Sequence, residues 1–471
     1  MTNHAPSNTP RTLTEALVPY ALPESSFRQF IPCREVTKRF LGEDVSFYPV
    51  MALSPVAMHT HIGLFRRCFY APFVELRLSA VTPELRQIAF VASTSTFECS
   101  YCLAHGLAFG DMLSGAMENQ LRRGCPLPKY SVNLEAEHLT PIQSAVIRLA
   151  IAVSKRKHTA SKGQLLPLCQ NLSRLFANGG NKHHSHDVEV IKSIVCFVGA
   201  LNTFMGIMGV QLEPKASAFA SVRAAEVGVN FEPGIHASAT HNTDSHRDSQ
   251  SGGHSDHMSA KHSSVGGILA NFIDFVGLVP DIIAMMALER EIYSETPTSN
   301  EALDEWVKHQ LSGNVPQFMA NIQRLGFKQA VCFGLQANVL RGSEHSANGD
   351  KSEVKWTRRE RCGLMYVYGT VVGCEEMRVL GKKLCPNGNT SDFKSLMNNQ
   401  ECETKWSSGF VAAKTVVVEH IVNAENVSTE TIQLIVKEFP AEGVVEVVSL
   451  ISFLCFLHRV IMLFNDEEMC Q

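Results

Sequence analysis

The sequence predicts an all-α protein. Apolar residues recur at helical spacing along much of the chain, whereas few runs alternate with the period of two that a half-buried strand requires. No Asn-Gly turn lies between β-branched runs except in the isolated stretch 386–389. A helix-start signal, Thr-Pro before an apolar stripe, also occurs twice.

The two Thr-Pro pairs predict helices because Thr can cap a helix and Pro suits its first position. After Thr82-Pro83 the apolar residues fall at i, i+3, i+4 and i+7: Leu85, Ile88, Ala89 and Ala92. After Thr140-Pro141 the stripe is Val146, Leu149, Ala150 and Val153. We therefore expect helices to begin at Pro83 and Pro141.

Two long apolar segments are expected to be core helices and not membrane spans. Ser193–Leu212 has 20 residues without a charge, enough to span a bilayer. However, it contains Asn202 and continues an apolar stripe that begins in the charged stretch before it. In Gly443–Phe464, only 11 uncharged residues lie between Glu446 and His458, which is too few to span.

Composition limits the function classes. The chain has 471 residues, 45% hydrophobic and 19% charged, with a net charge of -4 and no long run of one sign. A basic surface for nucleic acid is therefore not expected. The 14 cysteines are too sparse for a disulfide scaffold, and residues 1–22 lack a signal-peptide core, so we expect reduced thiols and a cytoplasmic location.

The stretch between Pro233 and Val265 is rich in Ser, His, Gly and Asp and almost free of large apolar residues. Such a stretch cannot bury enough surface to offset its ordering entropy, so it predicts a linker over 236–264 between domains 1–235 and 265–471. Its histidines could bind metal, but a solvated linker is the preferred interpretation because a flexible stretch does not hold ligands at fixed geometry.

The two domains repeat each other weakly, which predicts a tandem duplication. A shift of 275 residues places four residues on identical ones: Thr82, Arg86, Cys99 and Gly106 on Thr357, Arg361, Cys374 and Gly381. Across a different loop length, Cys68-Phe69 answers Cys332-Phe333. Each half also has an apolar helix, a Thr-started helix, a Cys-containing helix and a final apolar helix.

The stretch 97–106 contains the residues that are most suited to redox chemistry. If it opens a helix, Cys99 and Cys102 lie one turn apart, within disulfide reach, and His105 follows one turn later. Free N–H groups at a helix start favour thiolate, most strongly at the more N-terminal Cys99. A zinc site would need a fourth ligand, and no second cysteine pair with such spacing is evident, so no metal is expected.

The order of helices over residues 50–212, with Leu85-Arg86-Gln87, Cys99 to His105 and Leu139-Thr140-Pro141, resembles the alkylhydroperoxidase D / carboxymuconolactone decarboxylase superfamily. The resemblance implies an AhpD-like helical fold and the activity of a peroxidase or disulfide oxidoreductase that needs no cofactor. It also implies that the chain can form a homo-oligomer. It makes Cys102 the peroxidatic thiol, Cys99 the resolving thiol and His105 part of a proton relay. Its partners would be a hydroperoxide and a dithiol reductant, such as a thioredoxin-like or lipoyl protein.

Two positions depart from the family pattern. The family usually has a relay Glu 12 residues before the first Cys, where this chain has Gln87, and its His stands one position later than His105. Because an amide cannot accept a proton at neutral pH, His105 or the adjacent Glu98 would have to act without Gln87. We therefore expect weak peroxidase activity, or disulfide reductase activity without efficient turnover of peroxide.

The second half cannot form the dithiol, because the repeat places Met377 at the Cys102 position, Leu380 at that of His105 and Cys362 at that of Gln87. We expect it to keep the packing role and to cover the first domain. A first domain that keeps the dithiol, followed by a second domain that has lost it, is similar to the domain plan of the sestrins. The stretch shared with them is Cys99-Ser100-Tyr101. The alternative function is thus a catalytically weak regulatory or scaffold protein in the oxidative-stress response.

Overall fold

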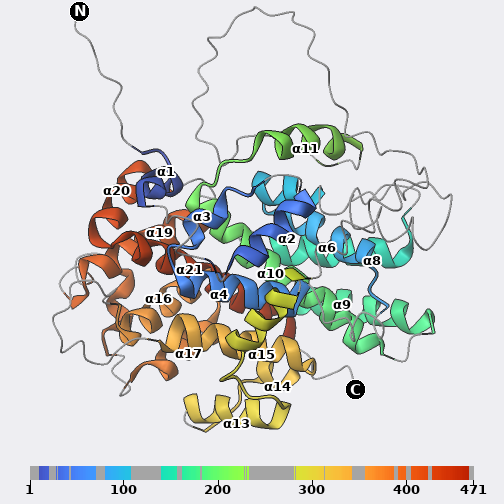
Figure 1. Ribbon diagram of the computed structural model, residues 1–471. Helices are drawn as coiled ribbons and strands as arrows, with labels where there is room; N and C mark the ends of the chain where they lie inside the picture. The colour runs from blue at the N-terminus through green and yellow to red at the C-terminus, as the bar shows by residue number, and fades with distance from the viewer. Residues whose placement is uncertain are drawn as a thin grey trace, which may run out of the picture.

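Every regular element that the structure describes is helical, which confirms the predicted all-α class (Figure 1). The structure is a computed structural model. It describes residues 10–20, 28, 30–41, 44–69, 80–107, 139–155, 162–180, 183–226, 229, 231–232, 280–281, 283–311, 313–341, 356–386, 391–398, 402, 405–422 and 427–465. The expected linker over 236–264 lies outside the described residues.

The helices occur in two sets with the same order. The first set is α4 (Pro55–Leu64), η3 (Phe65–Phe69), α6 (Pro83–Thr96), a helix described over 100–107, α8 (Pro141–Ser154), α9 (Lys162–Asn178) and α10 (His184–Met208). The second set is α15 (Leu325–Leu335), η4 (Gln336–Leu340), α16 (Arg358–Val371), α17 (Glu375–Leu384), α19 (Ser408–Val422), α20 (Thr429–Glu438) and α21 (Ala441–Phe464). Both η3 and η4 are π-helical turns that continue an α-helix.

Further short elements flank these sets. Before and after the first set lie α1 (Leu13–Leu17), η1 (Val18–Tyr20), α2 (Ile31–Leu41), α3 (Phe47–Met51) and α11 (Pro214–Glu226). Around the second set lie a helix over 283–292, α13 (Asn300–Gln310), α14 (Gln317–Asn321) and η6 (Ser391–Met397).

The helix starts have the predicted caps. The Thr82 hydroxyl accepts the N–H of Leu85, and Thr140 forms a capping box with Gln143. Thr357 caps α16 in the same way as Thr82 caps α6. These contacts confirm the predicted helix starts at Pro83 and Pro141.

The two arginines of the repeat also make equivalent contacts. Arg86 donates from Nη1 to the carbonyl of Phe69 at 2.8 Å, and Arg361 donates from Nη1 to the carbonyl of Asn338 at 3.1 Å. Each arginine thereby ties its Thr-capped helix to the π-helical turn before it.

One detail of the predicted repeat is wrong. The pair Cys68-Phe69 lies in η3, whereas Cys332-Phe333 lies inside α15, before η4. The equivalent of η3 is η4, so the cysteines of these two pairs occupy different elements. The Cys-Phe match is therefore a coincidence of sequence, and it gave the wrong alignment of α4 with α15.

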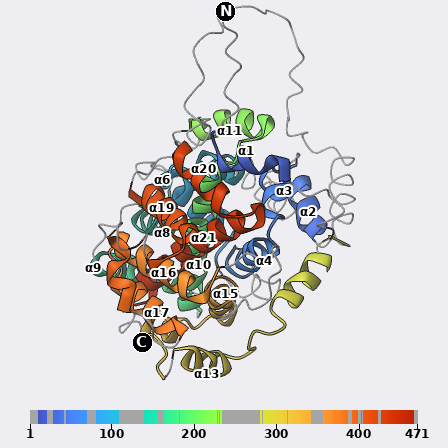
Figure 2. The same ribbon diagram turned by 90° about the vertical axis from the view of Figure 1, so that its left-hand side faces the viewer.

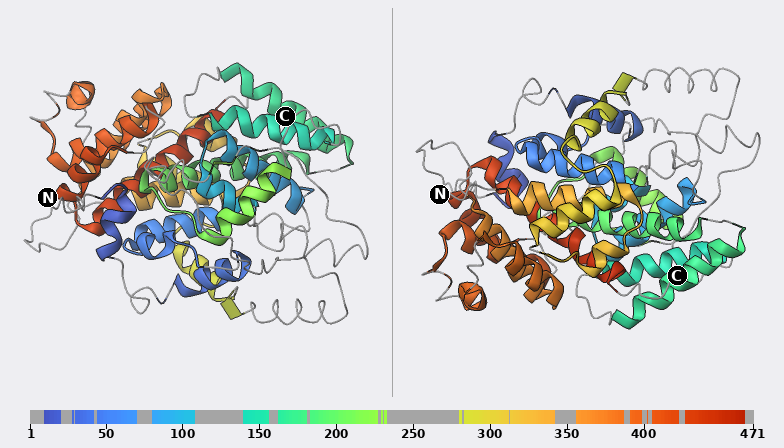
Figure 3. Two further views of the ribbon diagram at one scale, coloured as in Figure 1. Left: turned by 90° about the horizontal axis from the view of Figure 1, so that it is seen from above. Right: turned by 90° about the horizontal axis from the view of Figure 1, so that it is seen from below.

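The long helices α10 and α21 pack against each other at the centre of the molecule (Figure 1). The helices α6, α8 and α9 lie on one side of this pair, and α16, α17, α19 and α20 lie on the other, which Figure 2 turns toward the viewer. The views from above and below show the same division (Figure 3). The buried apolar residues of both sides form one continuous core.

Both central helices are long and apolar enough to cross a membrane by length and composition, and 94% of the apolar window of each is buried in the protein. For α21 this corrects the sequence analysis, which judged Gly443–Phe464 too interrupted to pass that test. The charges of Glu446 and Arg459 do not interrupt the helix, because both side chains are buried beside polar partners: Glu446 pairs with Arg361, and Arg459 donates to the carbonyl of Val195.

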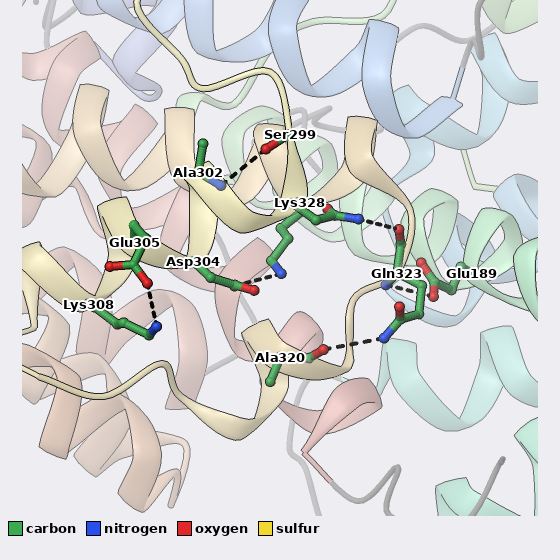
Figure 4. Close-up of polar contacts among 10 residues, drawn as sticks. Glu189, Ser299, Ala302, Asp304, Glu305, Lys308, Ala320, Gln323 and Lys328 are labelled. Atoms are coloured by element: carbon green, nitrogen blue, oxygen red, sulfur yellow. Dashed lines mark hydrogen bonds and ion pairs between the residues drawn. The ribbon is translucent and has the colours of Figure 1, made fainter.

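Polar contacts also join the two sets of helices. The carboxylate of Glu189 on α10 accepts the main-chain N–H groups of Gln323 and Arg324, at 3.0 and 2.8 Å, where the chain enters α15 (Figure 4). Beside this contact, Lys328 pairs with Asp304 at 2.7 Å. The guanidinium of Arg324 continues the junction, since it donates to the Ser193 hydroxyl at 2.9 Å.

Candidate active site at the dithiol helix

A tight turn connects α6 to the helix over 100–107, which we call the dithiol helix. Phe97 is the C-cap of α6, and Glu98 follows with φ 60°, in the left-handed region that favours glycine. Gly373 occupies the corresponding position of the second half, with φ 72°. The turn thus needs a left-handed residue in both halves, and the first half uses a glutamate for it. Helix 100–107 begins directly after Cys99.

The two thiols lie together and are closed off from solvent. Cys99 is 0% and Cys102 is 1% exposed, and the Sγ of Cys99 accepts the N–H of Cys102 at 3.5 Å. Burial, and then the hydrogen bond and charge of Cys99, raise the pKa of the Cys102 thiol. Burial opposes negative charge on both sulfur atoms, but the N–H of Cys102 and the place of Cys99 at the helix start favour Cys99 over Cys102 as the site of such charge.

His105 pairs with a carboxylate that the sequence analysis did not anticipate. Its Nε2 lies 3.0 Å from an oxygen of Glu213, and its Nδ1 lies 2.9 Å from the carbonyl of Tyr101. The Tyr101 hydroxyl donates to the other oxygen of Glu213 at 3.0 Å. The three side chains form one polar network beside the dithiol, in which Tyr101 and Glu213 are buried and His105 is half-buried.

Glu213 carries the negative charge of this network. Burial opposes ionisation of its carboxyl, but the hydrogen bond and charge of His105, together with the main-chain N–H of Ser46, lower its pKa to about 2. Both ring nitrogens of His105 face oxygen atoms, Nε2 that of Glu213 and Nδ1 that of Tyr101. The ionised carboxylate of Glu213 and the imidazole of His105 thus form a close polar pair.

The structure brings together only some of the predicted residues. Cys99 and Cys102 are adjacent. Gln87 is buried and its amide donates to the carbonyl of Gly106, which fastens α6 to the dithiol helix. His105 turns to Glu213, and none of its described contacts is to a thiol. The side chain of Glu98 is exposed.

Sequence reasoning missed Glu213 and assigned no role in the site to Tyr101. Tyr101 does pack, with its ring 4.3 Å from that of His105, but its hydroxyl also binds the carboxylate. The sequence did contain one indication of Glu213. It is the first charged residue after the uncharged segment Ser193–Leu212, and it directly precedes Pro214, the first residue of α11. A buried helix followed by a lone carboxylate is a place where a cation partner is expected.

The second half lacks this chemistry at the corresponding positions. Met377, Leu380 and Cys362 are all buried in the core, at 0%, 4% and 0% exposure. Gly381 approaches α16 as Gly106 approaches α6, so the packing of the helix pair is kept while the functional side chains are replaced.

No group of three or more His, Cys, Asp or Glu that could hold a metal ion occurs in the described ranges. A scan against models of protein families found no match. Searches among curated proteins and among solved structures found none either. The resemblance to the AhpD-like superfamily therefore depends on the motif and the order of helices alone.

Proposed function

We propose that the chain is a thiol-dependent oxidoreductase that reduces hydroperoxides through the Cys99–Cys102 dithiol. The observation that carries the proposal is the N–H of Cys102 directed at the Sγ of Cys99, because this contact holds the two cysteines together and favours Cys99 over Cys102 as the thiolate. An adjacent polar network of Tyr101, Glu213 and His105 supports it, since peroxide cleavage requires a proton for the leaving oxygen.

The reaction has two steps. The Cys99 thiolate attacks the terminal peroxide oxygen, so that an S–O bond forms, the O–O bond breaks and the alkoxide leaves after taking up a proton. Cys102 then attacks the Cys99 sulfur, which forms the disulfide and releases the oxygen as water once it is protonated. Two electrons pass from the thiols to the peroxide, and an external dithiol, thioredoxin-like or lipoyl, returns them.

The proposal assigns the attack to Cys99, whereas the resemblance assigns it to Cys102. The pKa of Cys102 is raised by burial and by Cys99, which makes it the better proton carrier and the poorer nucleophile in the reduced protein. Because both thiols are buried, peroxide reaches them only through local opening, and we expect turnover to be slow.

Single substitutions test the proposal and the assignment together. With an organic hydroperoxide and a dithiol reductant, Cys99→Ser and Cys102→Ser should both lose turnover. The matched control Cys374→Ser, the repeat position without a partner cysteine, should keep it. Sulfenic acid should be trapped at Cys99 in the Cys102→Ser variant. Trapping at Cys102 in Cys99→Ser alone would reverse the roles, and unchanged turnover in both variants would exclude the function.

The burial of the thiols favours a second candidate, a regulatory or scaffold protein with an AhpD-like relic as its first half. In that case the serine variants at Cys99 and Cys102 would retain every partner complex of the wild-type chain. Loss of a complex on peroxide treatment in wild type but not in these variants would instead connect the scaffold to the dithiol.

A further inference from the structure

We propose that a cleft between the two sets of helices, separate from the dithiol, binds a small oxyanion through Arg459 and Lys155. The cleft lies where α8, α10, α16, α19 and α21 meet. Its basic residues come from three of these elements: Lys155, His420, His458 and Arg459. None of the residues that the structure describes around it is acidic.

The burial of Arg459 without an acidic partner among the described residues is the strongest evidence for an anion site. Its side chain is 2% exposed and it is among the largest fully buried side chains of the described core. A guanidinium stays charged in proteins, and a buried charge without a counter-ion is costly. In the described part of the chain, no carboxylate lies within ion-pair distance of Arg459.

The protein contacts of Arg459 satisfy only one end of the guanidinium. Nη1 donates to the carbonyl of Val195 at 2.8 Å and, more weakly, to the hydroxyl of Ser154 at 3.4 Å. The group also lies 5.5 Å from the centre of the Phe97 ring. A guanidinium has five N–H donors in a planar fork, so its Nε and Nη2 donors remain for a bidentate oxyanion.

The position of Arg459 is fixed by its surroundings. A Cβ at Gly199 of α10 would lie 2.5 Å from its Nε, so the glycine makes the room in which the guanidinium lies. A second cation, Lys155, is the C-cap of α8 and is exposed, so it can reach an anion at the mouth of the cleft. The positive charges of Arg459 and Lys155 thus reach the cleft from two different helices, α21 and α8.

The remaining lining indicates the chemical class of the ligand. Thr203 and Tyr368 supply hydroxyl groups, and Val372 and Ile421 supply apolar walls. A small oxyanion, either a phosphate or the carboxylate of a short organic acid, matches this combination. Phe97 lines the cleft two residues before Cys99, so an occupied cleft touches the turn that enters the dithiol helix.

Binding is tested on the full chain by calorimetry and by thermal unfolding. The titrants are inorganic phosphate, acetate and butyrate, each against chloride at equal ionic strength. We expect saturable binding and a rise in Tm with at least one of them. Phosphate alone would point to phosphorylated ligands, and butyrate above acetate would point to short organic acids. The absence of saturable binding by all three overturns the proposal.

Two variants locate the site. Arg459→Met should abolish binding yet leave the ligand-free protein folded, because an unpaired buried charge is replaced by an apolar chain of similar length. Lys155→Ala should weaken binding about tenfold, whereas the exposed Lys437→Ala, outside the cleft, should not. If Arg459→Met does not fold, Lys155→Ala decides, and equal affinity in Lys155→Ala and Lys437→Ala contradicts the proposal.

Discussion

Glu213 is the residue that distinguishes this site from the one expected from the motif. The spacing of Cys99, Cys102 and His105 in the sequence is enough to place them on successive turns of one helix. It is not enough to find Glu213, which lies 108 residues beyond His105 and meets it only through the tertiary fold. Local periodicity predicts neighbours on one helix, and a partner brought by tertiary packing leaves no such trace.

The lowered pKa of the Glu213 carboxyl predicts a dependence of stability on pH. The pKa of Glu213 is lowered from its ordinary value of 4.5 to about 2, so the stabilisation is fully present above about pH 4.5 and is lost as the pH falls toward 2. Glu213→Gln should therefore lower the free energy of unfolding by about 3 kcal/mol at pH 7, and by progressively less below pH 4.5.

Urea unfolding of wild type and Glu213→Gln between pH 7 and pH 3 measures this difference. Glu295→Gln, at an exposed glutamate, serves as the control and should change stability little at any pH. A difference between Glu213→Gln and wild type that stays constant over this range would show that the carboxylate is not held by His105.

Glu98 carries backbone strain next to the first cysteine. A non-glycine residue in the left-handed region costs about 1–2 kcal/mol, and Gly373 shows that the second half avoids this cost. Glu98→Gly should raise the free energy of unfolding by about 0.5–1 kcal/mol, since part of the relief is offset by the greater freedom of glycine in the unfolded chain. The mirror control Gly373→Ala should lower it. A destabilised Glu98→Gly would mean that the Glu98 side chain contributes more than its backbone costs.

At the scale of elements, the helix starts were predictable and the π-helical turns were not. Thr82 and Thr140 cap their helices through local hydrogen bonds that depend only on adjacent residues. The π-helical turns η3 and η4 depend on contacts across the fold, such as the donation from Arg86 to the carbonyl of Phe69. Such contacts have no signal within the turn itself.

The pairing of α16 with α17 depends on Gly381. A Cβ there would lie 2.8 Å from the carbonyl oxygen of Cys362 and 3.1 Å from the main-chain nitrogen of Tyr366, and a backbone cannot yield as a side chain can. Gly381→Ala should therefore lower the free energy of unfolding by about 1–3 kcal/mol in spite of the higher helix propensity of alanine.

The matched control is Gly163→Ala in α9, where nothing lies within 4 Å of the added carbon. This substitution should leave stability unchanged or raise it by up to about 1 kcal/mol. Equal effects of Gly381→Ala and Gly163→Ala in chemical unfolding would contradict the close packing of α16 on α17.

At the scale of the whole molecule, the two sets of helices share one core, so stability is expected to be cooperative across them. Glu189 tests this coupling because its carboxylate satisfies the N–H groups of Gln323 and Arg324 across the junction. Glu189→Ala should lower the free energy of unfolding by about 2–4 kcal/mol and keep a single transition.

Gln323→Ala is the control for Glu189→Ala, since it retains the main-chain N–H and removes only an exposed side chain. It should change stability by less than about 0.5 kcal/mol. Separation of the unfolding curve of Glu189→Ala into two transitions would show that the halves unfold independently.

The proposed dithiol function has one direct test. Native protein is treated with a small excess of hydroperoxide, its remaining thiols are alkylated, and the peptide that contains Cys99 and Cys102 is examined by mass spectrometry. The proposal predicts a disulfide between these two cysteines that a dithiol reductant reverses, with Cys374 remaining alkylated. Recovery of both Cys99 and Cys102 as alkylated thiols after peroxide, in protein whose thiols react fully once unfolded, would contradict it.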